Sequence, residues 1–150
     1  MLVLKRLITT AGAIAVAVLT TAPPAFADTN PCTLVLPAQA AALSGGSGVG
    51  DWHHHTGTGR YGQETCHYPG PVNRAFFVAV HLSSAPFANV KMMTKPLGGV
   101  GDDAAWMSQA GVIAFVKHGT YVSMSWAGDA GRPAPSPQFL LAAKTAASKL

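Results

Sequence analysis

The segment from Gly111 to Ala127 constrains the fold more than any other part of the chain. Its residues, GVIAFVKHGTYVSMSWA, predict two strands that turn at His118-Gly119. Both turn residues reach the positive φ of a tight turn more readily than most residues do. Because side chains alternate along a strand, this turn gives the hairpin one apolar face and one face that carries hydroxyl groups. The apolar face holds Ile113, Phe115, Val122, Met124 and Trp126, and the other face holds Tyr121, Ser123 and Ser125.

The first 27 residues have the pattern of a secretory signal peptide. Lys5-Arg6 precedes an apolar run from Leu7 to Leu19, and Ala25-Phe26-Ala27 matches a cleavage site before Asp28. The apolar run is shorter than the ~20 residues that a membrane-spanning helix needs. We therefore expect a cleaved signal peptide at 1–27, no membrane span after cleavage, and a secreted or cell-envelope protein.

The remaining residues, 28–150, are enough for one domain with one core. The ten basic residues of the chain include Lys5 and Arg6, so residues 28–150 keep eight against six acidic residues, a net charge of +2. The basic residues are scattered rather than gathered in a stripe. This charge is too weak for the electrostatic surface that nucleic-acid binding requires, and we expect no nucleic-acid partner.

Cys32 and Cys66 are the two cysteines of the chain. In an exported protein an isolated pair of cysteines indicates a disulfide. The alternative is a free thiol that acts as a nucleophile. We predict the Cys32–Cys66 disulfide, which would link the first helix to the first strand.

Apolar periodicity predicts helices and strands that alternate along residues 28–150. The segment at about 45–62, between the first helix and the first strand, is rich in glycine and histidine and is predicted to be a long loop. We predict an α+β fold in which a four-stranded, mostly antiparallel sheet has helices on one face, with a helix-strand-strand unit occurring twice before a C-terminal helix. The predicted elements are a helix at 37–43, strands at 64–68 and 75–82, a helix at 86–94 with Phe87, Val90 and Met93 along one stripe, the hairpin, and a helix from Pro137 capped by Ser136, with Leu140, Ala143, Ala147 and Leu150 on one face.

The triplet His53-His54-His55 is the most unusual local feature of the sequence. Imidazoles bind zinc, copper and nickel. Side chains alternate in an extended segment, so His53 and His55 could converge on one ion, with His67 or Asp51 as a third ligand. The alternative is a solvated loop with incidental metal affinity. We expect no built-in cofactor, and at most weak binding of Zn, Cu or Ni that is lost as the imidazoles protonate.

No catalytic or cofactor-binding residues are predicted. The single glutamate is Glu64, and no spacing of serine, histidine and aspartate indicates a triad. Gly99-x-Gly101-x-x-Ala104 resembles a nucleotide-binding fingerprint but lacks the strand-helix-strand unit in which that motif works. A turn in which Asp102 bonds nearby backbone amides is the simpler interpretation.

The aromatic residues could line a sugar or peptide site, although such residues more often pack in a core. The residues concerned are Trp52, Tyr61, Tyr68, Trp106 and Trp126.

Several short motifs resemble small exported proteins of mycobacteria and related actinobacteria, many of which are lipoproteins with a domain of unknown function. The resemblance implies an envelope or secreted α+β domain that acts as a binding or accessory module, and it supplies no catalytic residues. This chain lacks the lipidation cysteine of those proteins, and its histidine triplet is not part of their pattern. The motifs are Pro31-Cys32-x-Leu34 with the alanine-rich helix after it, Cys66-x-Tyr68, Gly99-x-Gly101-Asp102-x-Ala104, the late hairpin and the Ala/Lys-rich last helix.

We therefore expect an exported, non-enzymatic binding or accessory protein. It is expected to be a monomer whose partner is an envelope or extracellular protein or a small ligand. The alternatives are a metal-binding protein that uses the His53–His55 segment and a small secreted hydrolase.

Overall fold

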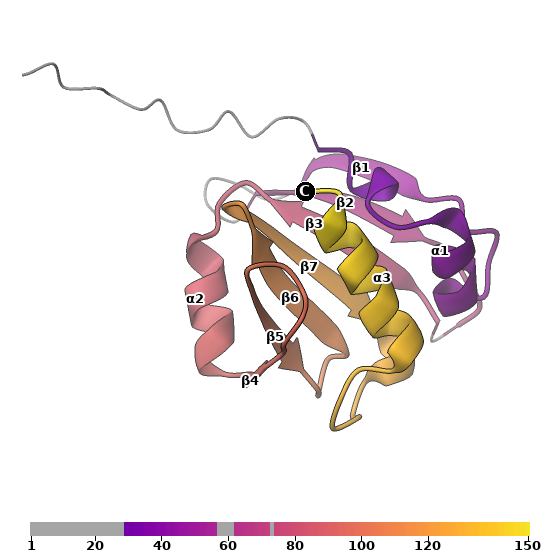
Figure 1. Cartoon of the computed structure of the whole chain (residues 1–150). Coiled ribbons are helices and arrows are strands. Elements are labelled where there is room, and N and C mark those ends of the chain that lie inside the picture. Colours follow the sequence, from indigo (N-terminus) through magenta and orange to yellow (C-terminus); the bar gives the residue numbers. More distant parts are fainter. Residues whose placement is uncertain (1–28, 57–61, 73) are drawn as a thin grey trace, which may run out of the picture.

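The computed structural model describes residues 29–56, 62–72 and 74–150 (Figure 1). The expected signal peptide at 1–27 lies outside the described residues, as do residues 57–61 of the expected Gly/His-rich loop. Across the described ranges, every helix is too short or too polar to cross a bilayer.

The fold is built on one antiparallel sheet of seven strands in the order β1-β2-β3-β7-β6-β5-β4. The α+β class is confirmed, but the predicted four-stranded sheet is wrong. Three strands follow the first α-helix and four follow the second, so the helix-strand-strand unit does not occur twice. The elements are η1 (Pro31–Thr33), α1 (Pro37–Ser44), β1 (Asp51–Thr56), β2 (Gln63–Tyr68), β3 (Phe76–His81), α2 (Ala85–Met92), β4 (Lys95–Pro96), β5 (Asp103–Met107), β6 (Val112–Lys117), β7 (Thr120–Trp126), η3 (Ala127–Asp129) and α3 (Pro137–Ser148).

Strands β6 and β7 form the hairpin in the predicted register, with Phe115 paired to Val122. His118 and Gly119 have φ values of 47° and 81°, the left-handed pair that a two-residue hairpin turn requires. The Asp102 carboxylate accepts a hydrogen bond from the backbone N–H of His118 at 2.7 Å. The Asp102 carboxylate therefore bonds a backbone amide, as predicted, but that amide lies 16 residues away in the hairpin turn and not in the local turn that was expected.

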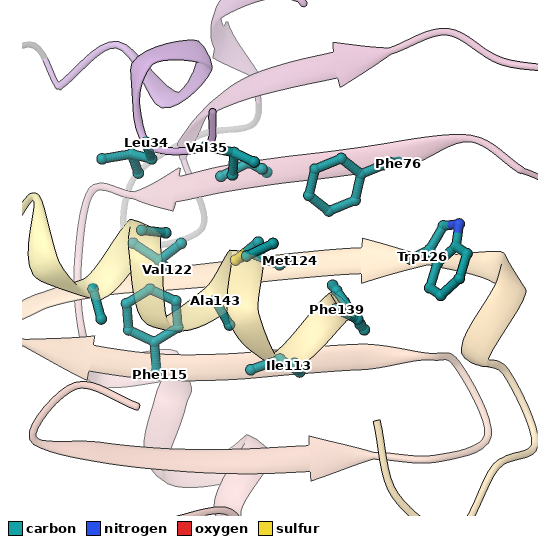
Figure 2. Packing of buried hydrophobic residues seen from close by; sticks show 14 of the residues in the cluster. Leu34, Val35, Phe76, Ile113, Phe115, Val122, Met124, Trp126, Phe139 and Ala143 are labelled. Carbon is teal, nitrogen blue, oxygen red and sulfur yellow. The ribbon is translucent and has the colours of Figure 1, made fainter. Parts of the chain in front are cut away.

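Helices α1 and α3 cover the first face of the sheet, where the main core lies (Figures 1 and 2). The ring of Phe139 meets three aromatic rings of the sheet edge-on, at centroid distances of 6.1 Å to Phe76, 6.2 Å to Trp106 and 5.9 Å to Trp126. Edge-on contacts of this kind add to the stabilisation from burial. The stripe of α3 that faces the sheet is otherwise made of small side chains, so the helix packs closely, and Phe139 takes the place predicted for Leu140. This stripe consists of Phe139, Ala142, Ala143, Ala146 and Ala147.

Helix α2 packs on the opposite, second face, so the prediction of helices on one face is wrong. Phe87 of α2 is buried against Tyr121 of β7, with the ring centroids 5.5 Å apart. Ala105 and Ala114 lie beneath this contact and are small enough to let the helix approach the sheet. Met93, which was predicted to belong to the buried stripe of this helix, follows its last turn and is exposed.

Three strands were not predicted because their sequences carry little aliphatic pattern. Strand β1 lies inside the predicted Gly/His-rich loop and has no aliphatic residue. Strand β4 has two residues, and β5 places alanines and Trp106 in a segment that lacks β-branched side chains. Their backbone pairing with stronger neighbouring strands makes them part of the sheet.

Candidate functional site

The second face of the sheet is covered unevenly. Helix α2 packs against β5 and β6. Toward the other end, β1, β2, β3 and β7 present side chains that stay partly or fully exposed. We call this part of the second face the open face, and define it by His53, His67, Phe77, Ser123 and Ser125.

Phe77 presents an exposed aromatic ring on the open face. Its ring stacks on His67 of the neighbouring strand, with centroids 4.6 Å apart and ring planes 13° apart. On its other side Phe77 pairs with Ser125, whose side chain is too small to cover the ring. Phe77 keeps 38% of its surface exposed although it lies on an inner strand of the sheet. A ring of this kind, with hydroxyl and imidazole groups beside it, suits a ligand that combines an apolar surface with hydrogen-bonding groups.

The structure brings a serine and a histidine together on β3 and β7, which the sequence spacing did not reveal. The Nε2 atom of His81 lies 2.8 Å from the Oγ atom of Ser123, and the ring of His81 stacks on Tyr121 at 4.0 Å. Burial lowers the pKa of His81 from 6.5 to about 4, so the imidazole is neutral at neutral pH. A neutral imidazole with so low a pKa is a poor general base for activating a hydroxyl group.

The Ser123–His81 pair also lacks the other parts of a hydrolytic site within the described structure. A catalytic histidine is normally oriented by a carboxylate, and the hydrogen bond seen at His81 goes to Ser123 alone. Strands β3 and β7 each have a neighbour on both sides, so their backbone N–H groups are engaged in the sheet and cannot form an oxyanion hole. The pair therefore fixes the Ser123 hydroxyl on the open face rather than activating it.

The histidine triplet lies on β1, where alternation separates neighbouring imidazoles. His53 is exposed on the open face, with its Nε2 atom 3.3 Å from Oδ2 of Asp51. Asp51 pairs in register with His67, so Asp51, His53 and His67 share one face of the sheet. His55 belongs to β1, but its side chain lies outside the described part of the structure. Among the described residues, no group of three histidine, cysteine, aspartate or glutamate side chains is arranged to hold a metal ion.

His54 points to the first face and meets the buried carboxylate of Glu64. Its Nδ1 atom lies 3.2 Å from Oε2 of Glu64, which also accepts a hydrogen bond of 2.9 Å from the indole N–H of Trp52. The rings of Trp52 and His54 are 3.7 Å apart at their centroids. Sequence reasoning missed this cluster. The alternation of Asp51 and His53 with Trp52 and His54 was the signal that could have indicated a strand here.

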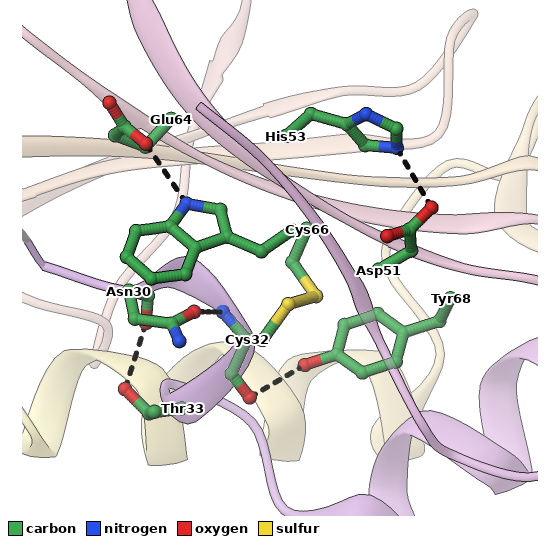
Figure 3. The surroundings of a disulfide bond; sticks show 9 residues. Asn30, Cys32, Thr33, Asp51, His53, Glu64, Cys66 and Tyr68 are labelled. Carbon is green, nitrogen blue, oxygen red and sulfur yellow. Dashed lines mark hydrogen bonds and ion pairs between the residues drawn. A yellow bond between two sulfur atoms is a disulfide. The ribbon is translucent and has the colours of Figure 1, made fainter. Parts of the chain in front are cut away.

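The predicted Cys32–Cys66 disulfide is present beside this cluster (Figure 3). It joins η1 to β2, and the Tyr68 hydroxyl donates a hydrogen bond of 3.0 Å to the carbonyl oxygen of Cys32. Burial raises the pKa of Tyr68 to about 12, so this phenol remains a hydrogen-bond donor. Gly50 passes directly under the bridge, where a Cβ atom would come within 2.2 Å of the Cys66 sulfur. The disulfide therefore anchors η1 to the sheet and requires a glycine before β1.

The other aromatic residues considered for a ligand site serve the core. Tyr68, Trp106 and Trp126 are buried, and Trp52 is tied to Glu64. Tyr61 lies outside the described residues. Phe77, which was predicted only as a strand residue, is thus an aromatic side chain that the described part of the fold presents on the open face.

No protein-family model matches the chain, and no curated protein or solved structure matches it. The resemblance to small exported actinobacterial proteins therefore remains a prediction.

Proposed function

We propose that this chain is an exported, non-enzymatic binding or accessory protein of the cell envelope or extracellular space, and that its ligand binds on the open face. The observation that carries the proposal is the exposed ring of Phe77, stacked on His67 and flanked by the small Ser125. An exposed aromatic ring beside imidazole and hydroxyl groups offers a ligand both an apolar surface and hydrogen-bonding partners.

Three further features support the proposal. The disulfide suits an oxidising compartment, as an exported protein meets. The segment 1–27 has the pattern of a signal peptide. The Ser123–His81 pair lacks an orienting carboxylate and oxyanion donors within the described residues, which favours binding over hydrolysis.

The test is an NMR titration of isotope-labelled residues 28–150 with soluble ring ligands, namely methyl glycosides and N-acetylated aromatic amino-acid amides. We expect shift changes at Phe77, His67 and Ser125 for at least one ligand class. The Phe77→Ser variant should lose these changes. Leu141→Ser is the matched control, because Leu141 is also an exposed apolar residue but lies on α3, which covers the first face of the sheet.

Chemical-shift changes that persist in Phe77→Ser, or that occur at residues outside the open face, would contradict the proposal. A serine-directed fluorophosphonate reagent tests the hydrolase alternative on the same samples. Labelling of Ser123 that disappears in His81→Gln would show that the serine is activated after all.

The metal-binding alternative is favoured by one observation, the shared face of Asp51, His53 and His67. We expect weak, pH-dependent binding of Zn(II), Cu(II) or Ni(II), measured by calorimetry on the protein and on the His53→Ala/His55→Ala variant. A tight site of defined stoichiometry that this variant abolishes would make metal handling the leading function.

A further inference from the structure

A hollow of about 380 Å³ lies at the far edge of the sheet, away from the open face and the histidine triplet. It is formed where the end of α2 meets β4 and the end of β5. Three methionines line it, together with Trp106 and a few polar residues. The lining residues are Met92, Met93, Thr94, Lys95, Trp106, Met107, Ser108 and Gln109.

The placement of these methionines differs from that of ordinary core methionines. Met92 is 79% exposed and Met93 is 73% exposed, whereas Met124 is fully buried. The chain has five methionines including Met1, so three of the other four line this one hollow. Single exposed apolar side chains are common on protein surfaces, but a group of three sulfur-bearing ones around one hollow is not a scattered arrangement.

Thioether sulfur is a soft ligand that prefers Cu(I) over the hard divalent ions. Both cysteines are held in the disulfide, so the methionines carry the available soft sulfur atoms of the described residues. Methionine is unbranched and has three rotatable bonds, so the exposed side chains of Met92 and Met93 can turn toward an ion near Met107.

The remaining lining residues favour a monovalent cation over a divalent one. Among the described residues, the lining includes no carboxylate that a divalent cation would need as an anionic ligand. Lys95 also lines the hollow, and its positive charge opposes any cation, a divalent ion more strongly than a monovalent one.

We propose that Met92, Met93 and Met107 form a binding site for one Cu(I) ion. This site is separate from the open face and from the His53–His55 segment, so it goes beyond the proposed function. An exported protein with such a site would hold copper in its reduced form.

The test is an anaerobic competition for Cu(I) between residues 28–150 and bicinchoninate, with ascorbate as the reductant. We expect one Cu(I) ion per chain and sulfur scatterers in the X-ray absorption fine structure. The Met92→Leu/Met93→Leu variant should weaken Cu(I) binding by more than the ~10-fold that loss of an outer-shell partner of a metal site costs. Met107→Leu should weaken it as well. Leucine keeps most of the apolar volume and removes the sulfur.

Two control variants distinguish binding at these three methionines from binding elsewhere on the chain. Met124→Leu removes a methionine that lies in the main core and should leave Cu(I) affinity unchanged. His53→Ala/His55→Ala should also leave it unchanged, which distinguishes this site from metal binding at the triplet. The proposal is overturned by an unchanged affinity in Met92→Leu/Met93→Leu, by loss of binding in the histidine variant, or by absorption spectra with nitrogen and oxygen neighbours alone. Circular dichroism of each variant confirms that the fold is intact.

Discussion

His81 links the stability of the protein to pH, because its imidazole is packed between Tyr121 and Ser123. In the unfolded chain it takes up a proton as the pH falls below 6.5, whereas in the folded protein burial lowers its pKa to about 4. The unfolded state therefore binds more protons between these two values, and the free energy of unfolding falls as the pH falls through this window.

We expect His81 to account for a loss of at most about 3 kcal/mol between pH 6.5 and pH 4. Urea unfolding at several pH values measures this loss. In His81→Gln the ring is replaced by a neutral amide that does not titrate, so the variant should show a shallower pH dependence. Equal slopes for the two proteins would mean that His81 does not carry the effect.

Phe115 is the residue at which the hairpin contributes most to the main core. Its side chain is fully buried on the first face, across from Val122. Phe115→Ala should lower the free energy of unfolding by about 3–5 kcal/mol, as other large-to-small core substitutions do. Phe77→Ala, which removes the same ring from the open face, is the matched comparison. If Phe77→Ala lowered the free energy of unfolding as much as Phe115→Ala does, the assignment of Phe77 to an exposed face would be wrong.

The disulfide joins η1 to β2, two elements that lie far apart in the sequence. It closes 34 residues of sequence between η1 and β2, a segment that contains α1 and β1. Replacing both cysteines by alanine should lower the free energy of unfolding by about 2–5 kcal/mol. Urea unfolding of the variant and the oxidised parent gives the difference. Amide hydrogen exchange should rise first in η1 and β1, and a uniform rise across the sheet would contradict this local role.

The β6–β7 hairpin could be predicted residue by residue because three independent signals agree in it. Its apolar alternation, its His118-Gly119 turn and its length all specify one register. Strand β1 could not be predicted in the same way, because Trp52 and His54 are held by Glu64 and by pairing with β2 rather than by aliphatic burial. Strand order and the face chosen by α2 also depend on contacts between distant segments.

The candidate site was less predictable than the fold. The Cys32–Cys66 pairing followed from composition and compartment alone, and the structure confirms it. The open face could not be predicted, because the local sequence around Phe77 does not show whether another element covers its ring. The contact between His81 and Ser123 joins residues 42 positions apart, so local spacing carried no signal. The predicted burial of Met93 failed because α2 ends at Met92.

At the scale of the whole molecule, the sequence of residues 1–27 has the pattern of a signal peptide. We therefore expect expression of the full chain in a secreting host to yield a protein that begins at Asp28. Intact-mass analysis should show the loss of residues 1–27. Treatment with an alkylating reagent should add no mass, because both cysteines are in the disulfide. A protein that keeps these residues and stays with the membrane fraction would contradict the expected export.

The two outermost strands determine how molecules of this protein behave toward one another at high concentration. Strand β4 has two residues, and Pro96 has no N–H group to offer a further strand. Strand β1 has a register shift between His53 and Thr56, which interrupts the regular spacing of its free edge. Neither edge strand offers a strand of another molecule a long row of free backbone N–H and C=O groups. During slow heating of a concentrated sample, turbidity should therefore follow the loss of circular dichroism rather than precede it.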